Sequence, residues 1–395
     1  MPKATIDETG KIQVPESTTR DRGLRSGAEY WFEQREGDLI LHPRRPDIHR
    51  LYVEPATSCN LRCRTCIRNV WQDPEALMSA ETFQQVLDGL RLLPEVKRVV
   101  FTGFGEPLVH PQIIPMIQAV RELGIAVSLG TNGILLDASV SRELVLLGVD
   151  RLVISLDGVQ PGTYADIRGT AVSPVVENIR ALGEVKRQLG SPLPLLGIEF
   201  VLLKRNVAEL GPLTALAAQL GATRVLVSNV LPYTADMREE ILYGYEPRAP
   251  ISPRGWPVRM DAYVMWGNLD LPRMHWAANR RCRFVQDRAT VVGWDGGVTP
   301  CYALSHNYTY YAVDSKQKRV SRYSLGSLNK QSLAQIWMSE DYVRFRAEVR
   351  DFRFPSCPDC DLRDSCDIRE RNEGCWGWNP SCADCLWAQD IVRCP

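Results

Sequence analysis

Between residues 50 and about 232, short runs rich in β-branched residues alternate with amphipathic stretches of helical spacing. The runs predict strands within residues 50–55, 96–103, 125–130, 151–158, 195–203 and 223–232. The intervening stretches predict helices within residues 80–93, 112–124, 140–148, 175–190 and 207–221. Such alternation is typical of α/β proteins that stack βα units on a parallel sheet. Because six units are fewer than the eight of a closed barrel, we expect a partial (β/α)6 barrel over residues 48–235.

Residues suited to chemistry stand where four of these expected strands end. A C-x3-C-x2-C cluster follows the first strand, GFGEP ends the second, GTNG the third and SLDG the fourth. Loops that follow parallel strands converge at one edge of the sheet, and function gathers there. We therefore expect a shared site that contains Cys59, Cys63, Cys66, Gly103, Gly105, Glu106, Pro107, Asn132, Ser155 and Asp157.

The twelve cysteines are distributed unevenly, with three between residues 59 and 66, none between 67 and 281, and nine from 282 to 394. The first residues, MPKATIDETGKIQ, lack the apolar core of a signal peptide, and no apolar run is long enough to span a membrane. We therefore expect a cytoplasmic protein whose reduced thiols bind metal in two separate regions. Lys+Arg and Asp+Glu balance at 47 each, which gives no electrostatic case for bulk nucleic-acid or membrane binding.

Residues 1–47 are predicted to form a small β domain. GKIQVP predicts a strand, residues 17–27 a short polar helix, and residues 28–43 a hairpin that turns at residues 36–38. This pattern resembles the swapped-hairpin domain of AbrB-like regulators, in which two chains interlock into one barrel. The resemblance implies a homodimer formed through residues 1–45. It implies nucleic-acid binding less strongly than an architectural or partner-docking role, because Arg20, Arg22 and Arg25 are offset by acidic neighbours.

The C-x3-C-x2-C cluster, the GFGEP turn and the six-strand alternation together resemble the radical S-adenosylmethionine superfamily. That family carries a Gly-Gly-Glu-Pro variant where this chain has GFGEP. The resemblance implies that Cys59, Cys63 and Cys66 hold a [4Fe-4S] cluster with one open iron, to which S-adenosyl-L-methionine binds. One electron then yields a 5'-deoxyadenosyl radical, which takes a hydrogen from the substrate. A three-thiol fragment of a zinc knuckle is the alternative, but such knuckles do not sit at the mouth of a βα barrel.

The same resemblance implies a role for individual residues in binding S-adenosyl-L-methionine. Glu106 would accept the methionine amino group, and the two glycines of GFGEP would let the backbone approach closely. Thr65 departs from the family, which usually has an aromatic residue before the third cysteine. Ser155 and Asp157 would meet the ribose or methionyl part, Arg168 the carboxylate, and Glu199 and Asn229 would flank the adenine. The full set of expected cofactor-binding residues is Gly103, Gly105, Glu106, Pro107, Asn132, Ser155, Asp157, Arg168, Glu199 and Asn229.

The C-terminal cysteines resemble the SPASM extension, which holds auxiliary iron-sulfur clusters. The matching pattern is Cys282-x13-Gly-x4-Cys301 followed by Cys357-x2-Cys360-x5-Cys366. The family usually has its next cysteine three residues later, whereas Cys375 follows after eight, so the ligand assignment stays open. Our first division gives one [4Fe-4S] cluster Cys282, Cys301, Cys375 and Cys382, and gives the other Cys357, Cys360, Cys366 and either Cys385 or Cys394.

A zinc ion could replace one of these clusters, because four thiolates also suit zinc. Auxiliary clusters would serve as an electron path or as a substrate anchor. We take residues 282–395 as this domain and residues 236–281 as a connector. The connector region is dense in large side chains that predict packing between domains or a substrate-lining wall, namely Trp256, Met265, Trp266, Met274, His275 and Trp276.

The order of an AbrB-like start, CRTCIRN, GFGEP and a terminal CADCLWAQDIVRCP resembles the radical enzymes associated with tungsten-dependent oxidoreductases. Those are regarded as maturases of the tungsten-pterin cofactor or of its host enzyme. The resemblance implies a protein, peptide or pterin-cofactor substrate and an electron donor such as ferredoxin or flavodoxin. Two alternatives stay open, a radical enzyme that crosslinks or epimerises a ribosomal peptide, and a redox-sensing DNA-binding regulator.

Overall fold

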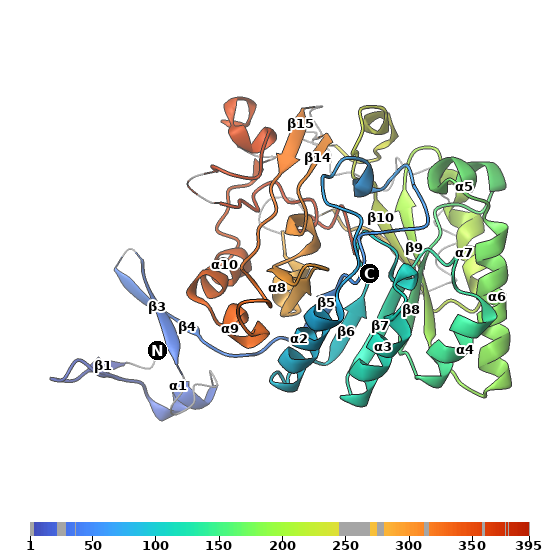
Figure 1. Ribbon diagram of the computed structural model, residues 1–395. Helices are drawn as coiled ribbons and strands as arrows, with labels where there is room; N and C mark the ends of the chain where they lie inside the picture. Colours follow the sequence, from blue (N-terminus) through green and yellow to red (C-terminus); the bar gives the residue numbers. More distant parts are fainter. Residues whose placement is uncertain are drawn as a thin grey trace.

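The computed structural model describes residues 4–21, 29–35, 37–244, 269–274, 280–311, 316–357, 360–375, 377 and 379–394. Its centre is a ten-stranded sheet in the order β11-β10-β9-β8-β7-β6-β5-β12-β13-β16 (Figure 1). The six predicted strands are present and mutually parallel. They are β5 (Arg50–Val53), β6 (Arg98–Phe101), β7 (Ala126–Thr131), β8 (Arg151–Ser155), β9 (Leu195–Leu202) and β10 (Arg224–Asn229). The expected α/β partial barrel is therefore confirmed.

Helices cover the outer side of this sheet (Figure 1). The five predicted ones are α2 (Ala80–Arg91), α3 (Ile113–Glu122), α4 (Ala138–Leu146), α6 (Ser173–Gln188) and α7 (Leu210–Gln219). Helix α2 illustrates why they form: the Ser79 hydroxyl caps its start by accepting from the Thr82 backbone N–H, and its apolar stripe, including Val86, packs into the core. A further helix, α5 (Pro161–Arg168), was not predicted. It is short, and it ends at Gly169 in the left-handed conformation.

The cysteine-rich part of the chain extends the same sheet. Strand β12 (Ala289–Val292) pairs parallel with β5, and β13 (Gly297–Thr299) and β16 (Gly326–Ser327) continue in antiparallel pairs. At the other edge, β11 (Leu269–Asp270) pairs with β10. The remaining elements are α8 (Arg283–Gln286), the hairpin β14 (Tyr308–Tyr311) and β15 (Gln317–Val320), α9 (Leu333–Trp337) and α10 (Glu340–Arg350). The barrel and the cysteine-rich part thus share one sheet.

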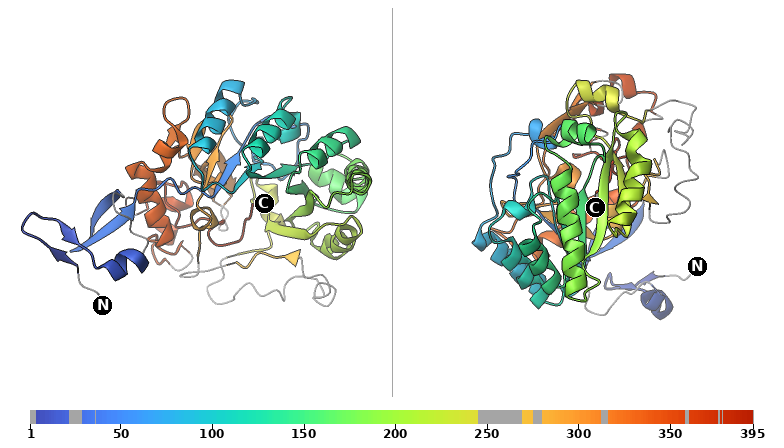
Figure 2. Two further views of the ribbon diagram at one scale, coloured as in Figure 1. Left: turned by 90° about the horizontal axis from the view of Figure 1, so that it is seen from below. Right: turned by 90° about the vertical axis from the view of Figure 1, so that its right-hand side faces the viewer.

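The N-terminal residues form a separate small unit beside this body (Figure 2). It contains β1 (Thr5–Ile6), β2 (Ile12–Gln13), α1 (Glu16–Asp21), β3 (Tyr30–Arg35) and β4 (Asp38–Pro43). The predicted hairpin is present, with Arg35 opposite Asp38. It docks on the C-terminal part, where Trp31 Nε1 donates to the Met338 carbonyl over 3.1 Å and Arg353 pairs with Glu33.

Some expectations fall outside the described residues. These are Arg22, Arg25, Trp256, Met265, Trp266, His275 and Trp276, together with the side chain of Arg20. Met274 is described, and it is buried in the main apolar core as the packing interpretation predicts. Within the described ranges, no helix combines the length and the apolar character that a membrane span needs.

Candidate functional site

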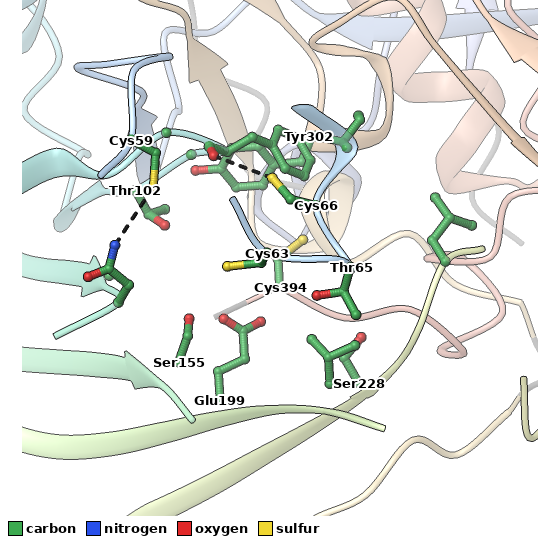
Figure 3. Close-up of a pocket in the computed structure, with 18 of the residues that line it drawn as sticks. Cys59, Cys63, Thr65, Cys66, Thr102, Ser155, Glu199, Ser228, Tyr302 and Cys394 are labelled. Atoms are coloured by element: carbon green, nitrogen blue, oxygen red, sulfur yellow. Dashed lines mark hydrogen bonds between the residues drawn. The ribbon is translucent and has the colours of Figure 1, made fainter. Parts of the chain in front are cut away.

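A cavity opens at the carboxyl ends of the parallel strands and contains about 1210 Å³ of space not filled by atoms, part of it open to solvent (Figure 3). The loops after β5, β6 and β7 and the last residues of β8, β9 and β10 line it. Of the thirteen residues predicted for the radical site, all but Asp157 lie in its wall: Cys59, Cys63, Cys66, Gly103, Gly105, Glu106, Pro107, Asn132, Ser155, Arg168, Glu199 and Asn229.

Cys59, Cys63 and Cys66 come from one loop between β5 and a short 3₁₀ helix at Ile67–Asn69. The Cys66 backbone N–H donates to the Cys63 carbonyl over 3.1 Å, which turns the loop so that its thiols line the cavity. Burial raises the pKa of the Cys66 thiol to about 12. Such a thiol becomes a thiolate when a metal compensates its charge. Three thiols at the mouth of a cavity with room for another molecule fit a cluster with one open iron.

Glu106 ties together the loops that follow β6 and β7. Its carboxylate, which is almost fully buried, accepts hydrogen bonds from the Asn132 backbone N–H at 2.7 Å, the Thr131 hydroxyl at 2.7 Å and the Leu108 backbone N–H at 3.0 Å. Burial raises the pKa of Glu106, and these hydrogen bonds oppose that rise. Its carboxylate therefore already serves three donors of the protein. The predicted bond to a methionine amino group stays a prediction.

The two glycines of GFGEP are required by close packing against the cysteine loop. A Cβ atom at Gly105 would lie 2.1 Å from the Ala56 carbonyl oxygen, and one at Gly103 would lie 2.4 Å from Glu54 Cγ. The Glu106 backbone N–H donates to the Ser58 carbonyl over 2.9 Å in the same contact. The groups that approach these glycines, a backbone carbonyl at Gly105 and the Glu54 side chain at Gly103, thus belong to the protein, and the result is a rigid joint between the GFGEP turn and the cysteine loop.

Asp157 acts on the cavity through Arg168. Asp157 is fully buried; its Oδ2 lies 2.6 Å from Arg168 Nε, and its Oδ1 accepts from the Val201 backbone N–H over 2.8 Å. Burial works to lower the pKa of Arg168, but the charges of Asp157 and Cys63 outweigh it and raise that pKa. Arg168 Nη1 in turn lies 3.7 Å from the Cys63 sulfur. Asp157 therefore lies behind the cavity wall and holds the arginine in place, and its expected contact with the ribose or methionyl group stays a prediction.

Glu199 adds a titratable group on the side of the cavity that faces the cysteine loop. Burial, followed by the charge of Asp157, raises the pKa of Glu199 to about 7. Figure 3 shows its carboxylate pointing into the cavity beside Ser155. Asn229, at the end of β10, donates from Nδ2 to the Ile391 carbonyl over 3.1 Å. The chain end therefore packs on the barrel and brings Arg393 and Cys394 into the wall.

A buried charge cluster joins the cysteine-rich part to this wall. His306 Nε2 lies 2.9 Å from Glu54 Oε2, and its Nδ1 contacts Asp73. Burial alone would lower the pKa of His306, but Glu54 and Asp73 raise it to about 9. Glu54 Oε1 also accepts from the Phe104 backbone N–H over 2.8 Å. One carboxylate thus holds both the GFGEP turn and a histidine from the C-terminal part.

The nine C-terminal cysteines form two groups and leave one thiol over. A second cavity, with about 1120 Å³ of space not filled by atoms, is lined by the cysteines of the first group and by Cys394. Burial raises the pKa of Cys382 well above its ordinary value, and charges at three other thiols of this group add to the rise. This first group is Cys282, Cys301, Cys382 and Cys385.

The other group is Cys357, Cys360, Cys366 and Cys375. Burial raises the pKa of Cys375, and Cys366 and Cys360 lie close enough for their charges to add to that rise. This grouping differs from our division, which placed Cys375 in the first group and considered Cys385 for the second. Which thiols bind which cluster stays a prediction. The Ser381 backbone N–H donates to the Asn372 carbonyl over 2.8 Å and closes a loop that separates Cys375 from Cys382.

Cys394 is the remaining thiol, and it lies in the walls of both large cavities. Its sulfur accepts from Trp387 Nε1 over 3.1 Å. Burial raises the pKa of Cys394 to about 12, and the charge of Glu199 adds to the rise. Cys394 was expected as a possible ligand of an auxiliary cluster. Because each group already has four thiols and Cys394 lies in the walls of both cavities, we propose instead that it stays outside the clusters.

Across the described residues, no three His, Cys, Asp or Glu side chains converge closely enough to hold one metal ion. A tetrahedral zinc with Zn–S bonds of about 2.3 Å needs its sulfurs within about 4 Å of one another. Thiolates of a [4Fe-4S] cluster bind different irons and stand further apart. Zinc in place of one auxiliary cluster stays the alternative prediction.

Sequence reasoning missed several residues of the site. Tyr302 and Arg393 line the main cavity, and Glu54 and His306 form the charge cluster behind it. Tyr302 directly follows Cys301 and Arg393 directly precedes Cys394, so their position next to candidate ligands was an available signal. Glu54 and His306 are far apart in the sequence, and no local pattern marks that pair.

Comparisons with known proteins bear on this arrangement. The model of the radical SAM superfamily matches residues 53–197, and that of an iron-sulfur cluster-binding domain, SPASM, matches residues 282–361. The tungsten-containing aldehyde ferredoxin oxidoreductase cofactor-modifying protein of Pyrococcus furiosus is 37% identical over 348 residues, which are 87% of this chain and 96% of that protein. A PqqA peptide cyclase of Streptomyces rochei is 30% identical over 190 residues, 48% of this chain and 50% of that protein.

Solved structures show the same fold at low sequence identity. SuiB of Streptococcus suis bound to S-adenosylmethionine has a TM-score of 0.58 and 18% identity, over 83% of this chain and 73% of that one. SuiB bound to its precursor peptide SuiA has a TM-score of 0.58 and 17% identity, over 81% of this chain and 71% of that one. At these identities the similarity shows that the chain shares the fold of SuiB.

Proposed function

Because the chain belongs to the radical S-adenosylmethionine superfamily and carries its SPASM iron-sulfur domain, we propose that it is a maturase for a tungsten-dependent oxidoreductase. Its substrate would be the pterin cofactor of that enzyme or the enzyme itself. The observation that carries this proposal is the 37% identity, over nearly the whole of both chains, to a protein named for modifying such a cofactor. Identity of this extent covers the barrel and the cysteine-rich part together.

The chain's own residues would hold and orient the reagents. Cys59, Cys63 and Cys66 would bind the [4Fe-4S] cluster, which together with S-adenosyl-L-methionine supplies a 5'-deoxyadenosyl radical. Arg168, held by Asp157, presents a fixed positive charge at the cavity wall and beside Cys63, and so suits a carboxylate of the bound nucleoside. The rigid joint at Gly103 and Gly105 would keep the cluster loop still while the substrate reacts.

Glu199 and Cys394 are the groups placed to handle protons on the substrate side. With a pKa near 7, Glu199 can either accept or give a proton at neutral pH. Cys394 carries a protonated thiol in the same wall. The two cysteine groups of the C-terminal part would hold auxiliary [4Fe-4S] clusters, one of them at the second cavity, which Cys394 also lines.

Partners follow from the same proposal. The cluster needs an electron donor such as ferredoxin or flavodoxin. A homodimer through residues 1–45 is favoured by large apolar side chains exposed on the N-terminal unit, with Ile6 71% and Phe32 66% exposed and Leu39 51% exposed. A second chain that interlocks with this unit would cover them.

The peptide-modifying alternative keeps some support, because half of the chain resembles a PqqA peptide cyclase. Membership of an enzyme superfamily argues against the redox-sensing DNA-binding regulator. The two hypotheses differ in the molecule that is modified: the pterin cofactor or the oxidoreductase in the maturase proposal, and a separate small peptide in the alternative.

The test is to produce a tungsten oxidoreductase in cells with either the wild-type chain or its Cys63→Ala variant, and to compare products by mass spectrometry. The proposal expects a difference in the extracted pterin cofactor or in a peptide of the oxidoreductase. Identical cofactors and identical peptides would contradict it. A mass change confined to a separate small peptide would favour the alternative.

A further inference from the structure

A third cavity lies inside the barrel at the amino-terminal ends of the strands, the edge opposite to the radical site. It contains about 690 Å³ of space not filled by atoms, part of it open to solvent. Four arginines line it, and each is the first residue of its strand: Arg50 of β5, Arg98 of β6, Arg151 of β8 and Arg224 of β10. Among the described residues, no Asp or Glu lines it.

The arrangement follows from the alternation of side chains along a strand. Arg98 and Val100 line the cavity, whereas Val99 between them is fully buried in the outer core. Arg50 stands directly opposite Arg98 in the ladder. Like charges directly opposite each other destabilise a sheet. Repulsion between these arginines therefore lowers the stability of the fold at this edge, and apolar residues in their place would avoid it.

Only two of these charges are neutralised within the described part of the chain. Arg50 pairs with Asp287 over 2.8 Å, and Arg224 pairs with Asp270. Arg98 has one hydrogen bond, from Nη1 to the Ser128 hydroxyl at 3.5 Å, and Arg151 has no partner in the described ranges. Burial lowers the pKa of Arg151, and the charges of the three other arginines lower it further.

We propose that these four arginines form a binding site for a small anion that carries phosphoryl groups. Guanidinium groups bind phosphoryl oxygens in pairs, and two unneutralised cations match a ligand with at least two negative charges. The size of the cavity restricts the ligand to a small molecule. Arg50 and Arg224 also line the cavity of the first auxiliary cysteine group, so the anion would lie next to that group. This inference does not depend on the proposed function.

The test uses the anaerobically purified full chain with its clusters, saturated with S-adenosyl-L-methionine so that the main cavity is filled. Inorganic diphosphate is titrated by calorimetry, and ADP is titrated separately. One saturable site is expected for diphosphate. Tighter binding of ADP would identify a nucleotide as the source of the phosphoryl groups, and equal or weaker binding would identify the free anion.

Variants link the binding to the cavity. Arg98→Gln and Arg151→Gln are expected to weaken diphosphate binding by about tenfold or more, the value of one charge-assisted contact. Arg187→Gln is the matched control, because Arg187 is exposed and pairs with Glu184 on α6. Arg151→Lys keeps the charge and should retain more affinity than Arg151→Gln.

Stability without ligand separates binding from a role in folding. The thermal midpoint of Arg151→Gln should equal or exceed that of the wild type, because the substitution removes repulsion. Absence of saturable binding in the wild type would overturn the proposal. So would equal affinity in the wild type and both glutamine variants, or a loss in Arg151→Lys as large as in Arg151→Gln.

Discussion

His306 Nε2 lies 2.9 Å from Glu54 Oε2, which joins the cysteine-rich part to the strand that leads into the cluster loop. Both side chains are at least 97% buried. Glu54 also receives the Phe104 backbone N–H, so the pair fixes the GFGEP turn as well. The radical site and the auxiliary domain are therefore connected by a charge contact.

The first prediction concerns the pH dependence of stability. The pKa of His306 is raised from 6.5 to about 9 in the folded protein. The protonated histidine therefore stabilises the fold fully below pH 6.5, and this stabilisation is lost as the pH rises through about 9. The shift corresponds to at most about 3 kcal/mol. The thermal midpoint of the wild type should fall over this range, and that of His306→Gln should start lower and fall less. His49→Gln, at a half-exposed histidine, is the control. Parallel falls in the wild type and His306→Gln would contradict the prediction.

The second prediction concerns the positioning of Arg168. Asp157→Asn removes the charge that holds the arginine, and breaking a buried pair in this way costs about 3–5 kcal/mol. The variant should unfold at a lower temperature and bind S-adenosyl-L-methionine more weakly, as measured by equilibrium dialysis. Asp166→Asn is the control: Asp166 lies in the same helix as Arg168 but is exposed, so this variant should change the unfolding temperature and the affinity by little. Unchanged affinity in Asp157→Asn would show that Arg168 does not need its partner.

The third prediction separates the two auxiliary groups by iron content. The wild type should hold about 12 iron atoms in three [4Fe-4S] clusters. Cys357→Ala with Cys375→Ala should lose one cluster, whereas Cys282→Ala with Cys375→Ala should lose two. Cys394→Ala should keep all three clusters and still cleave S-adenosyl-L-methionine. Loss of two clusters from the first pair would refute the grouping.

The fourth prediction concerns assembly. A chain that lacks residues 1–45 should be monomeric by light scattering, and the full chain should be dimeric. A milder variant, Phe32→Ser with Leu39→Ser, replaces two exposed apolar side chains and should shift the equilibrium the same way. Dimers that persist in both variants would place the interface elsewhere.

The sequence predicts the barrel well because each strand carries its own apolar pattern. The six strands and five helices needed no information from distant residues. Strand β12 could not be predicted in this way, since its four residues form a strand by pairing with β5, more than 200 residues earlier in the chain. Helix α5 escaped prediction because its length is that of two turns and few of its residues are buried.

The site was predictable where a motif contacts the cavity directly, and less so where one residue acts through another. Asp157 has the expected position at the end of a strand, but its side chain points to Arg168. Cys375 lies near Cys360 and Cys366 in the fold, which cysteine spacing does not reveal. In both cases the contacts of the residue depend on how distant parts of the chain pack together, which residue type and spacing do not reveal.

The central claim is that the cavity cleaves S-adenosyl-L-methionine by radical chemistry. The measurement is 5'-deoxyadenosine formation by the anaerobically reconstituted chain with dithionite, followed by chromatography. We expect the wild type to form 5'-deoxyadenosine and Cys63→Ala to form none. A wild-type protein that holds all three clusters and binds S-adenosyl-L-methionine, yet releases no 5'-deoxyadenosine on reduction, would contradict the account.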